Sequence, residues 1–123
     1  MSETEDFSAW PVPKPIFAPD ALDGPSDSFY TNAYSRYPGA DLHLMFPAVF
    51  HQITDNTDIQ LAVSSDGRNW SRPSRESILD CGDSESGEPG GVYVNAALFI
   101  LPDGRFAIPY LGRRSRHHQV YYT

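Results

Sequence analysis

The chain has 123 residues, the size of one ordinary domain at most. Its 40% hydrophobic and 13% aromatic content is enough for a packed core. Its net charge of −7 argues against a general nucleic-acid binder, which needs a basic face, and against association with an anionic membrane surface. The single cysteine, Cys81, excludes an internal disulfide framework, and the 11 prolines and nine glycines predict short elements separated by turns.

Residues 1–26 are expected to form an extended N-terminal segment. They begin with an acidic stretch, residues 1–6, that lacks the basic and apolar regions of a secretory signal. No apolar run in the sequence approaches transmembrane length. The default expectation is therefore a cytoplasmic protein without a membrane partner.

The stretch 27–73 is predicted to form four antiparallel strands joined by turns. Tyr30 and Asn32 indicate the first strand, because they alternate with smaller residues at the period of a strand. A Pro-Gly turn then leads to an apolar second strand at 42–50, which contains Pro47. Because proline cannot donate to a sheet ladder, we expect a bulge or an unpaired neighbour at this position.

A third strand is predicted at 59–63, followed by a hairpin at Asp66-Gly67 and a short fourth strand near Trp70. Asp-Gly supplies the positive φ angles that a tight hairpin turn requires. We therefore expect Asp66 to be a turn residue and Trp70 to pack between neighbouring units. No segment shows a convincing 3.6-residue period with caps, so no helix is predicted.

The same pattern recurs in the second half of the chain. The aromatic-x-Asn-Ala stretch 30–33 matches 93–96 at an offset of 63 residues, and Pro47 matches Pro109 at an offset of 62. A second Asp-Gly hairpin lies at 103–104, and a third strand of this unit is predicted at residues 119–122. We expect the same irregularity at Pro109 as at Pro47.

A repeated unit of four antiparallel strands is typical of a β-propeller blade. We therefore expect an all-β partial propeller: an N-terminal segment (1–26), a first blade (27–73), a connecting loop (74–91) and a second, incomplete blade (92–123). Propellers close with four to eight blades, so two blades leave open edges. We expect either the N-terminal part of a longer protein or a small self-assembling one, with the remaining blades or further copies as partners.

The stretches 27–38, 44–51 and 57–73 together resemble the five-bladed β-propeller glycoside hydrolases, the superfamily of invertases, levansucrases and arabinanases, and most closely its family 32-like members. The resemblance runs from about Phe17 to the end of the chain. Its most specific part is Leu-Ala-x-Ser-x-Asp-Gly-x-x-Trp at 61–70. Sialidase Asp-boxes contain a related hairpin, so a sialidase-like propeller is an alternative. The resemblance implies a five-bladed propeller with a carbohydrate ligand.

Enzymes of this superfamily use three carboxylates around a central pocket, since one must protonate the leaving oxygen while another attacks or activates water. The resemblance implies Glu88, which precedes Pro89, as the general acid, and Asp27 as the stabilising aspartate. Their alternative interpretations are a loop carboxylate and a turn residue. No stretch resembles the nucleophile motif of the family. The 123 residues are therefore expected to lack a full catalytic set, and a non-catalytic carbohydrate-binding or structural propeller is the alternative function.

Five further residues are candidate substrate-binding groups. Tyr30, Asn32, Tyr93 and Asn95 recur at the repeat period on strands expected to line the central channel, and Asp58 opens the third strand. Aromatic faces and side-chain amides suit a sugar ligand. The alternative is structural, with the four repeated residues serving every blade and Asp58 capping a strand.

No cofactor and no metal site is predicted. His51, His117 and His118 are the histidines that raise the question. Adjacent histidines on a strand point to opposite faces, and no carboxylate or further histidine lies at a convincing ligand spacing.

Overall fold

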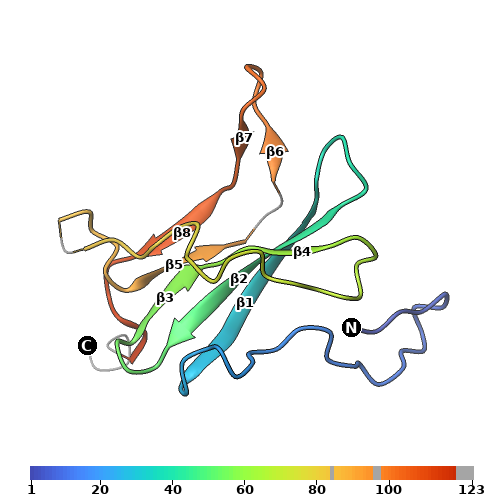
Figure 1. Ribbon diagram of the computed structural model, residues 1–123, viewed down its shortest axis with the longest axis horizontal. Coiled ribbons are helices and arrows are strands. Elements are labelled where there is room, and N and C mark those ends of the chain that lie inside the picture. Colours follow the sequence, from blue (N-terminus) through green and yellow to red (C-terminus); the bar gives the residue numbers. More distant parts are fainter. Residues whose placement is uncertain (84, 96–97, 119–123) are drawn as a thin grey trace.

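The computed structural model describes residues 1–83, 85–95 and 98–118 (Figure 1). The third strand predicted at residues 119–122 lies outside them. The described residues form eight short strands and no α-helix, and every strand pairing is antiparallel, which confirms the all-β class. The same residues contain no helix long and apolar enough to cross a membrane.

The first sheet contains four strands from the first predicted unit. They are β1 (Asp27–Arg36), β2 (His43–His51), β3 (Asn56–Ile59) and β4 (Ala62–Ser64). The order is β1–β2–β3, and β4 lies beside the other half of β2 on the same side as β3. β2 is therefore the centre of the sheet, and its residues from Phe46 to Phe50 are buried.

Pro47 lies opposite a break in the third strand. The predicted strand is split into β3 and β4 at Gln60 and Leu61, and the N–H of Gln60 donates to the carbonyl of Pro47 over 3.1 Å. Because the N and C=O of one strand residue point to the same side, the missing N–H of Pro47 faces this break. On the other side, the pairing with β1 shifts register between Phe29 and Thr31. The irregularity predicted at Pro47 is confirmed.

The second unit forms two small two-stranded sheets. β5 (Gly91–Val94) pairs with β8 (Tyr110–Arg113), and β6 (Phe99–Ile100) forms a hairpin with β7 (Phe106–Ala107). Gly104 at the hairpin tip has a φ of 84°, as the Asp-Gly prediction required.

The predicted repeat is visible in the strand register. Asn32 pairs with Pro47 in the first sheet, and in the second sheet the pairing of Val94 with Tyr110 ends one residue before Asn95 and Pro109. Pro109 lies in the gap between β7 and β8, outside both ladders. In both units the strand with the aromatic-x-Asn motif pairs antiparallel with the strand that carries or follows the proline, and the irregularity at the second proline is also confirmed.

The Asp66-Gly67 hairpin forms as predicted. Val63 and Ser71 exchange two backbone hydrogen bonds of 2.8 and 3.0 Å, and Gly67 has a φ of 70°. The predicted fourth strand is reduced to this single bridge. The indole N–H of Trp70 donates to the Gly67 carbonyl, and its ring lies near His43 of β2, so Trp70 packs within its own unit rather than between units.

The core lies between the first sheet and β5 (Figure 1). All four residues of β5 are buried, and the hydroxyl of Thr57 on β3 donates to the carbonyl of Val92 over 3.0 Å. Gly91 has a φ of 121°, and a Cβ there would lie 2.2 Å from Thr57 Oγ1. Only glycine allows β5 to approach β3 this closely.

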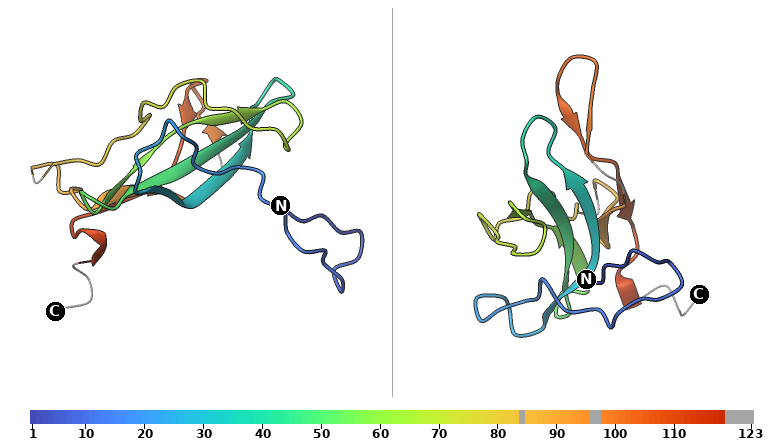
Figure 2. Two further views of the ribbon diagram at one scale, coloured as in Figure 1. Left: turned by 60° about the horizontal axis from the view of Figure 1, so that its bottom comes forward. Right: turned by 90° about the vertical axis from the view of Figure 1, so that its right-hand side faces the viewer.

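The segment 74–90 is not entirely a loop. The N–H of Ile59 donates to the carbonyl of Leu79 over 2.9 Å, so part of the segment covers the outer edge of β3. The N-terminal segment first loops away from the sheets (Figure 2) and then returns, where Phe17 stacks on Phe29 with ring centroids 4.6 Å apart. Arg72 lies over the Phe29 ring and pairs with Asp23, which fixes this segment to the first unit.

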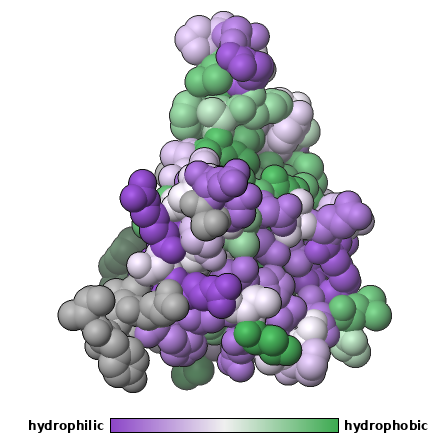
Figure 3. All heavy atoms as spheres, turned by 90° about the vertical axis from the view of Figure 1, so that its left-hand side faces the viewer, coloured by the Kyte–Doolittle hydropathy of each residue, from purple (hydrophilic) through white to green (hydrophobic). Residues whose placement is uncertain are grey.

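The hairpin β6–β7 projects from the rest of the molecule and carries exposed apolar side chains below its polar tip (Figures 1 and 3). Phe99, Ile100 and Phe106 are each about half exposed. These exposed apolar side chains lie together on the paired strands of the hairpin.

Candidate functional site

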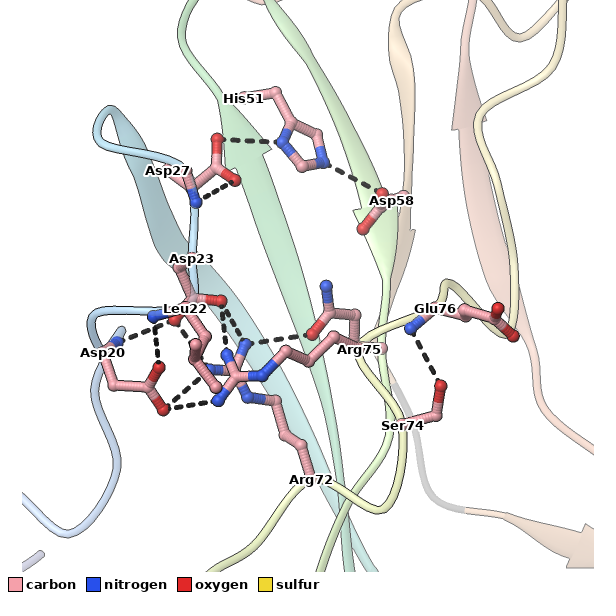
Figure 4. Close-up of polar contacts among 12 residues, drawn as sticks. Asp20, Leu22, Asp23, Asp27, His51, Asp58, Arg72, Ser74, Arg75 and Glu76 are labelled. Atoms are coloured by element: carbon pink, nitrogen blue, oxygen red, sulfur yellow. Dashed lines mark hydrogen bonds and ion pairs between the residues drawn. The ribbon is translucent and has the colours of Figure 1, made fainter.

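Three polar side chains, Asp27, His51 and Asp58, meet on one face of the first sheet, and we call them the His51 cluster (Figure 4). Asp27 pairs with His51, and Asp58 pairs with Val49 two residues along β2, so all three side chains leave the same face. His51 Nδ1 lies 2.9 Å from Asp27 Oδ1, and Nε2 lies 2.9 Å from Asp58 Oδ2. The structure thus joins two carboxylates that the sequence proposed separately for a site.

The His51 cluster is mostly shielded from water, with 16–29% of each side chain exposed. Burial by itself lowers the pKa of His51, but the hydrogen bonds to Asp58 and Asp27 outweigh it, and the pKa is raised above 6.5. A protonated imidazole satisfies both carboxylates, since each nitrogen then donates. The other oxygen of Asp58, Oδ1, is buried and has no hydrogen-bond partner among the described residues.

The two hydrogen bonds of 2.9 Å on opposite ring nitrogens hold the bonded carboxylate oxygens roughly 7–8 Å apart, within the range of about 6.5–9.5 Å used by inverting glycosidases. The imidazole of His51 fills the space between them. A glycosidic bond cannot lie between Asp27 and Asp58 while His51 keeps this position. In the arrangement seen, the two hydrogen bonds favour the protonated form of the imidazole.

Tyr30 and Tyr93 lie together, but apart from the His51 cluster. Their ring centroids are 6.1 Å apart, and Tyr30 lies equally close to Phe50. Phe50 is next to His51 on β2, so this aromatic group belongs to the opposite face of the sheet. Tyr93 is buried, and its hydroxyl has no hydrogen-bond partner among the described residues.

The other predicted site residues are not drawn together. Asn32 and Asn95 are exposed, and no side-chain hydrogen bond of either is found within the described residues. Glu88 lies against Gly112 of β8, where an added Cβ would meet its Oε1 at 2.2 Å, and it accepts a long hydrogen bond of 3.5 Å from Tyr110. In the part of the chain that the structure describes, no hydrogen bond or ion pair joins Glu88 to Asp27.

An open groove of about 460 Å³ lies beside the Asp66-Gly67 hairpin, and the sequence did not predict it. Its lining includes Tyr34, His43, Met45, Asp66, Arg68 and Trp70, together with Met1, Glu3 and Ile16 of the N-terminal segment. The Tyr34 hydroxyl lies 2.8 Å from His43 Nδ1, and the ring centroids of His43 and Trp70 are 6.4 Å apart. Only the strand register could have revealed that these residues meet.

The rim of the groove is charged. The backbone N–H groups of Asn69 and Arg68 donate to the carboxylate of Asp66 over 2.8 Å each and hold its pKa well below the usual range. Asp66 is therefore an ionised acceptor, while the guanidinium of Arg68 pairs with Glu3 over 2.8 Å. The groove combines aromatic walls with the ionised Asp66 and the Arg68–Glu3 ion pair.

A second group missed by the sequence contains Asp55, His117 and His118. Each offers one ligand atom, and these atoms all lie within 4.8 Å of one another. The expectation that adjacent histidines diverge assumed an extended strand, but β8 ends at Arg113 and both histidines follow it. The carboxylate comes from the β2–β3 turn, more than 60 residues away, so spacing along the sequence could not reveal it.

Comparison with known proteins adds no family to this description. No family model, curated protein or solved structure matches the chain. A functional assignment therefore depends on the side chains described above.

Proposed function

We propose that the protein binds carbohydrate and that the glycan lies in the groove between Tyr34 and Trp70. One observation carries this proposal: two aromatic side chains line an open groove whose rim carries Asp66, Arg68 and His43. Small-molecule sites combine aromatic walls with a few polar groups, within volumes of about 300–1,000 Å³. The groove, at about 460 Å³, has this size.

The chemistry of a sugar matches these groups. A sugar ring has apolar C–H faces that pack on aromatic rings, and hydroxyls that both donate and accept hydrogen bonds. Asp66 accepts, Arg68 donates, and His43 does either according to its tautomer. The sequence resemblance to the propeller glycoside hydrolases favours the same class of ligand.

Trp70→Ala is expected to weaken glycan binding at least about tenfold, because it removes one stacking surface of the groove. The measurement is quenching of tryptophan fluorescence by soluble arabino-, fructo- and xylo-oligosaccharides. The chain has two tryptophans, so a Trp10→Phe background leaves Trp70 as the sole reporter for the parent protein. Isothermal titration calorimetry then compares the parent with Trp70→Ala and Tyr34→Ala.

Phe106→Ala is the matched control, since Phe106 is another exposed aromatic residue and lies on the β6–β7 hairpin. It should leave the affinity unchanged. Equal affinity in the parent and in Trp70→Ala, or no binding of any oligosaccharide tested, would contradict the proposed groove.

Glycoside hydrolysis is the second candidate function, and the separation of the Asp27 and Asp58 carboxylates favours it. For these residues to act on a substrate, His51 must swing out of the space between them. Its side chain is 29% exposed, so one side of the ring already reaches solvent. Glu88 remains the general acid that the resemblance implies.

Asp58→Asn and Glu88→Gln are each expected to reduce hydrolysis of aryl glycosides by at least about 100-fold, the usual contribution of general acid–base catalysis. The assay follows nitrophenol release from a panel of furanosides and pyranosides. Asp41→Asn, an exposed carboxylate in the β1–β2 turn, is the control. If Glu88→Gln still hydrolyses the substrates, Glu88 is not the general acid. If the parent protein shows no hydrolysis, carbohydrate binding remains the proposed function.

We also propose a partner surface on the second unit. Phe99, Ile100 and Phe106 of the hairpin, with Tyr110 and Leu111 of β8, expose apolar area on short strands that each pair with one neighbour among the described residues. Further propeller blades or a second copy of the chain suit this surface.

A further inference from the structure

We propose that Asp55, His117 and His118 form a binding site for one divalent transition-metal ion of the zinc class. The site is independent of the glycan groove and of the His51 cluster. Two imidazoles and one carboxylate are the ligand set found in zinc sites with three protein ligands, which leave a fourth position to water.

The three ligand atoms are already near the separation that an ion requires. They lie within 4.8 Å of one another. Zinc binds nitrogen and oxygen at about 2.0–2.2 Å, so the ligands of one tetrahedral ion are roughly 3–3.5 Å apart. The side chain of His118 is 70% exposed, and its Nδ1 pairs directly with Asp55 Oδ1. An ion between these two atoms replaces this direct contact.

Backbone contacts fix the position of Asp55. It has a φ of 57°, in the left-handed region that aspartate tolerates better than most residues, and its N–H donates to the carbonyl of His51 over 2.8 Å. The N–H of His118 donates to Asp55 Oδ2 over 3.0 Å, and the N–H of His117 donates to the Asp55 carbonyl over 3.3 Å. The β2–β3 turn and residues 117–118 are therefore joined before any ion binds.

His117 carries the second independent observation. Its Nε2 lies 3.0 Å from the hydroxyl of Tyr30, while its Nδ1 is buried and has no hydrogen-bond partner among the described residues. Metal-bound histidines use one nitrogen for the ion and place the other on a hydrogen-bond partner. A buried nitrogen without a partner is costly, and an ion bound at Nδ1 removes that cost.

The site lies away from the other two candidate groups. Tyr30 and Phe50 separate it from the His51 cluster, because Phe50 packs on both His117 and His118 on the opposite face of the sheet from His51. The two remaining histidines, His43 and His51, have other partners.

The test uses the chain without an affinity tag. Titration with Zn²⁺ by calorimetry should give one site with a dissociation constant of about 1 μM or tighter, and Co²⁺ should give the visible absorption of a tetrahedral complex. His118→Ala and His117→Ala should each weaken binding at least about 100-fold. His43→Ala, which removes a histidine outside the site, should bind as the parent does.

Tyr30→Phe tests whether Tyr30 positions His117 rather than binding the ion itself. It keeps the ring packing of Tyr30 and removes only the hydroxyl, so the affinity should fall by about tenfold while the Co²⁺ spectrum stays tetrahedral. Circular dichroism checks that each variant is folded. If His117→Ala unfolds, His118→Ala still tests the site, because His118 is exposed. The proposal fails if the parent binds no Zn²⁺ at micromolar concentration, or if folded His118→Ala binds it as tightly as the parent.

Discussion

Asp23→Ala is expected to lower the free energy of unfolding by about 3 kcal/mol, one of the largest effects of any single substitution in this chain. Asp23 and Arg72 form a bidentate ion pair, with both N–O distances at 2.6 Å, and their side chains are only 6% and 3% exposed. Removing the carboxylate leaves the guanidinium of Arg72 buried without its main counter-charge. Gln60 at 3.1 Å and Asp20 at 3.4 Å replace it only in part.

The loss should spread beyond the ion pair. Arg72 lies over the rings of Phe29 and Phe17. Asp23 also accepts a hydrogen bond from Arg75 over 3.0 Å (Figure 4). The pair therefore holds the N-terminal segment, the first strand and the segment after Ser71 in one place. We expect amide hydrogen exchange to rise first in residues 17–23.

Urea denaturation followed by circular dichroism measures the effect. Asp41→Ala is the matched control, since it removes the carboxylate of the exposed Arg36–Asp41 pair and should change the unfolding free energy by less than about 1 kcal/mol. Equal midpoints for the two variants would show that the Asp23–Arg72 pair contributes no more than an exposed one.

The same pair predicts a loss of stability in acid. The hydrogen bond from Arg72 lowers the pKa of Asp23 from 3.8 to about 2, although burial opposes the shift. A carboxyl group with a lowered folded-state pKa stabilises the protein above its unfolded pKa and loses that contribution as the pH falls through its folded pKa. Stability should therefore fall between about pH 4 and pH 2, less steeply in Asp23→Asn than in the parent.

The sequence predicted those parts of the fold that depend on local chemistry. Asp66-Gly67 and Asp103-Gly104 form the expected hairpins, since positive φ at glycine is a local requirement. Pro47 and Pro109 mark breaks, since a missing N–H disturbs any ladder. The short fourth strand near Trp70 was predicted and is a single bridge, whereas the pairing of Leu79 with β3 depends on tertiary packing and was not predicted.

The candidate sites show the same division. Asp27 and Asp58 were singled out one by one, but their shared partner, His51, followed only from the strand register. The groove needs the Trp70 hairpin to fold back on β2. Ligand spacing along the chain cannot reveal a group such as Asp55, His117 and His118, because a turn supplies one member and a distant segment the other two.

His51→Gln is expected to lower the free energy of unfolding by about 2 kcal/mol at pH 5.5, and the difference should shrink as the pH rises. The cause is the number of N–H groups that the imidazole can donate. A protonated ring donates to both Asp27 and Asp58, whereas a neutral ring has one N–H and presents a lone pair to the other carboxylate. Glutamine carries no charge at any pH, so it loses the low-pH contribution.

The direction of the pH dependence follows from the pKa of His51, which is raised above 6.5 in the folded protein by Asp58 and Asp27 against the opposing effect of burial. A histidine with a raised folded-state pKa stabilises fully below its unfolded pKa and loses that contribution as the pH rises through the folded pKa. The unfolding free energy of the parent should therefore decline above about pH 6.5, and that of His51→Gln should not decline in this way.

Denaturation at a series of pH values measures both curves, with His43→Gln as the control, because His43 bonds a tyrosine hydroxyl rather than two carboxylates. Nitrogen-15 shifts of the His51 ring report its protonation directly. Parallel curves for the parent and His51→Gln would mean that the imidazole does not hold the two carboxylates by its charge. Curves that converge as the pH rises would establish that the charged imidazole holds the two carboxylates. Hydrolysis at Asp27 and Asp58 would then require this imidazole to move away from them.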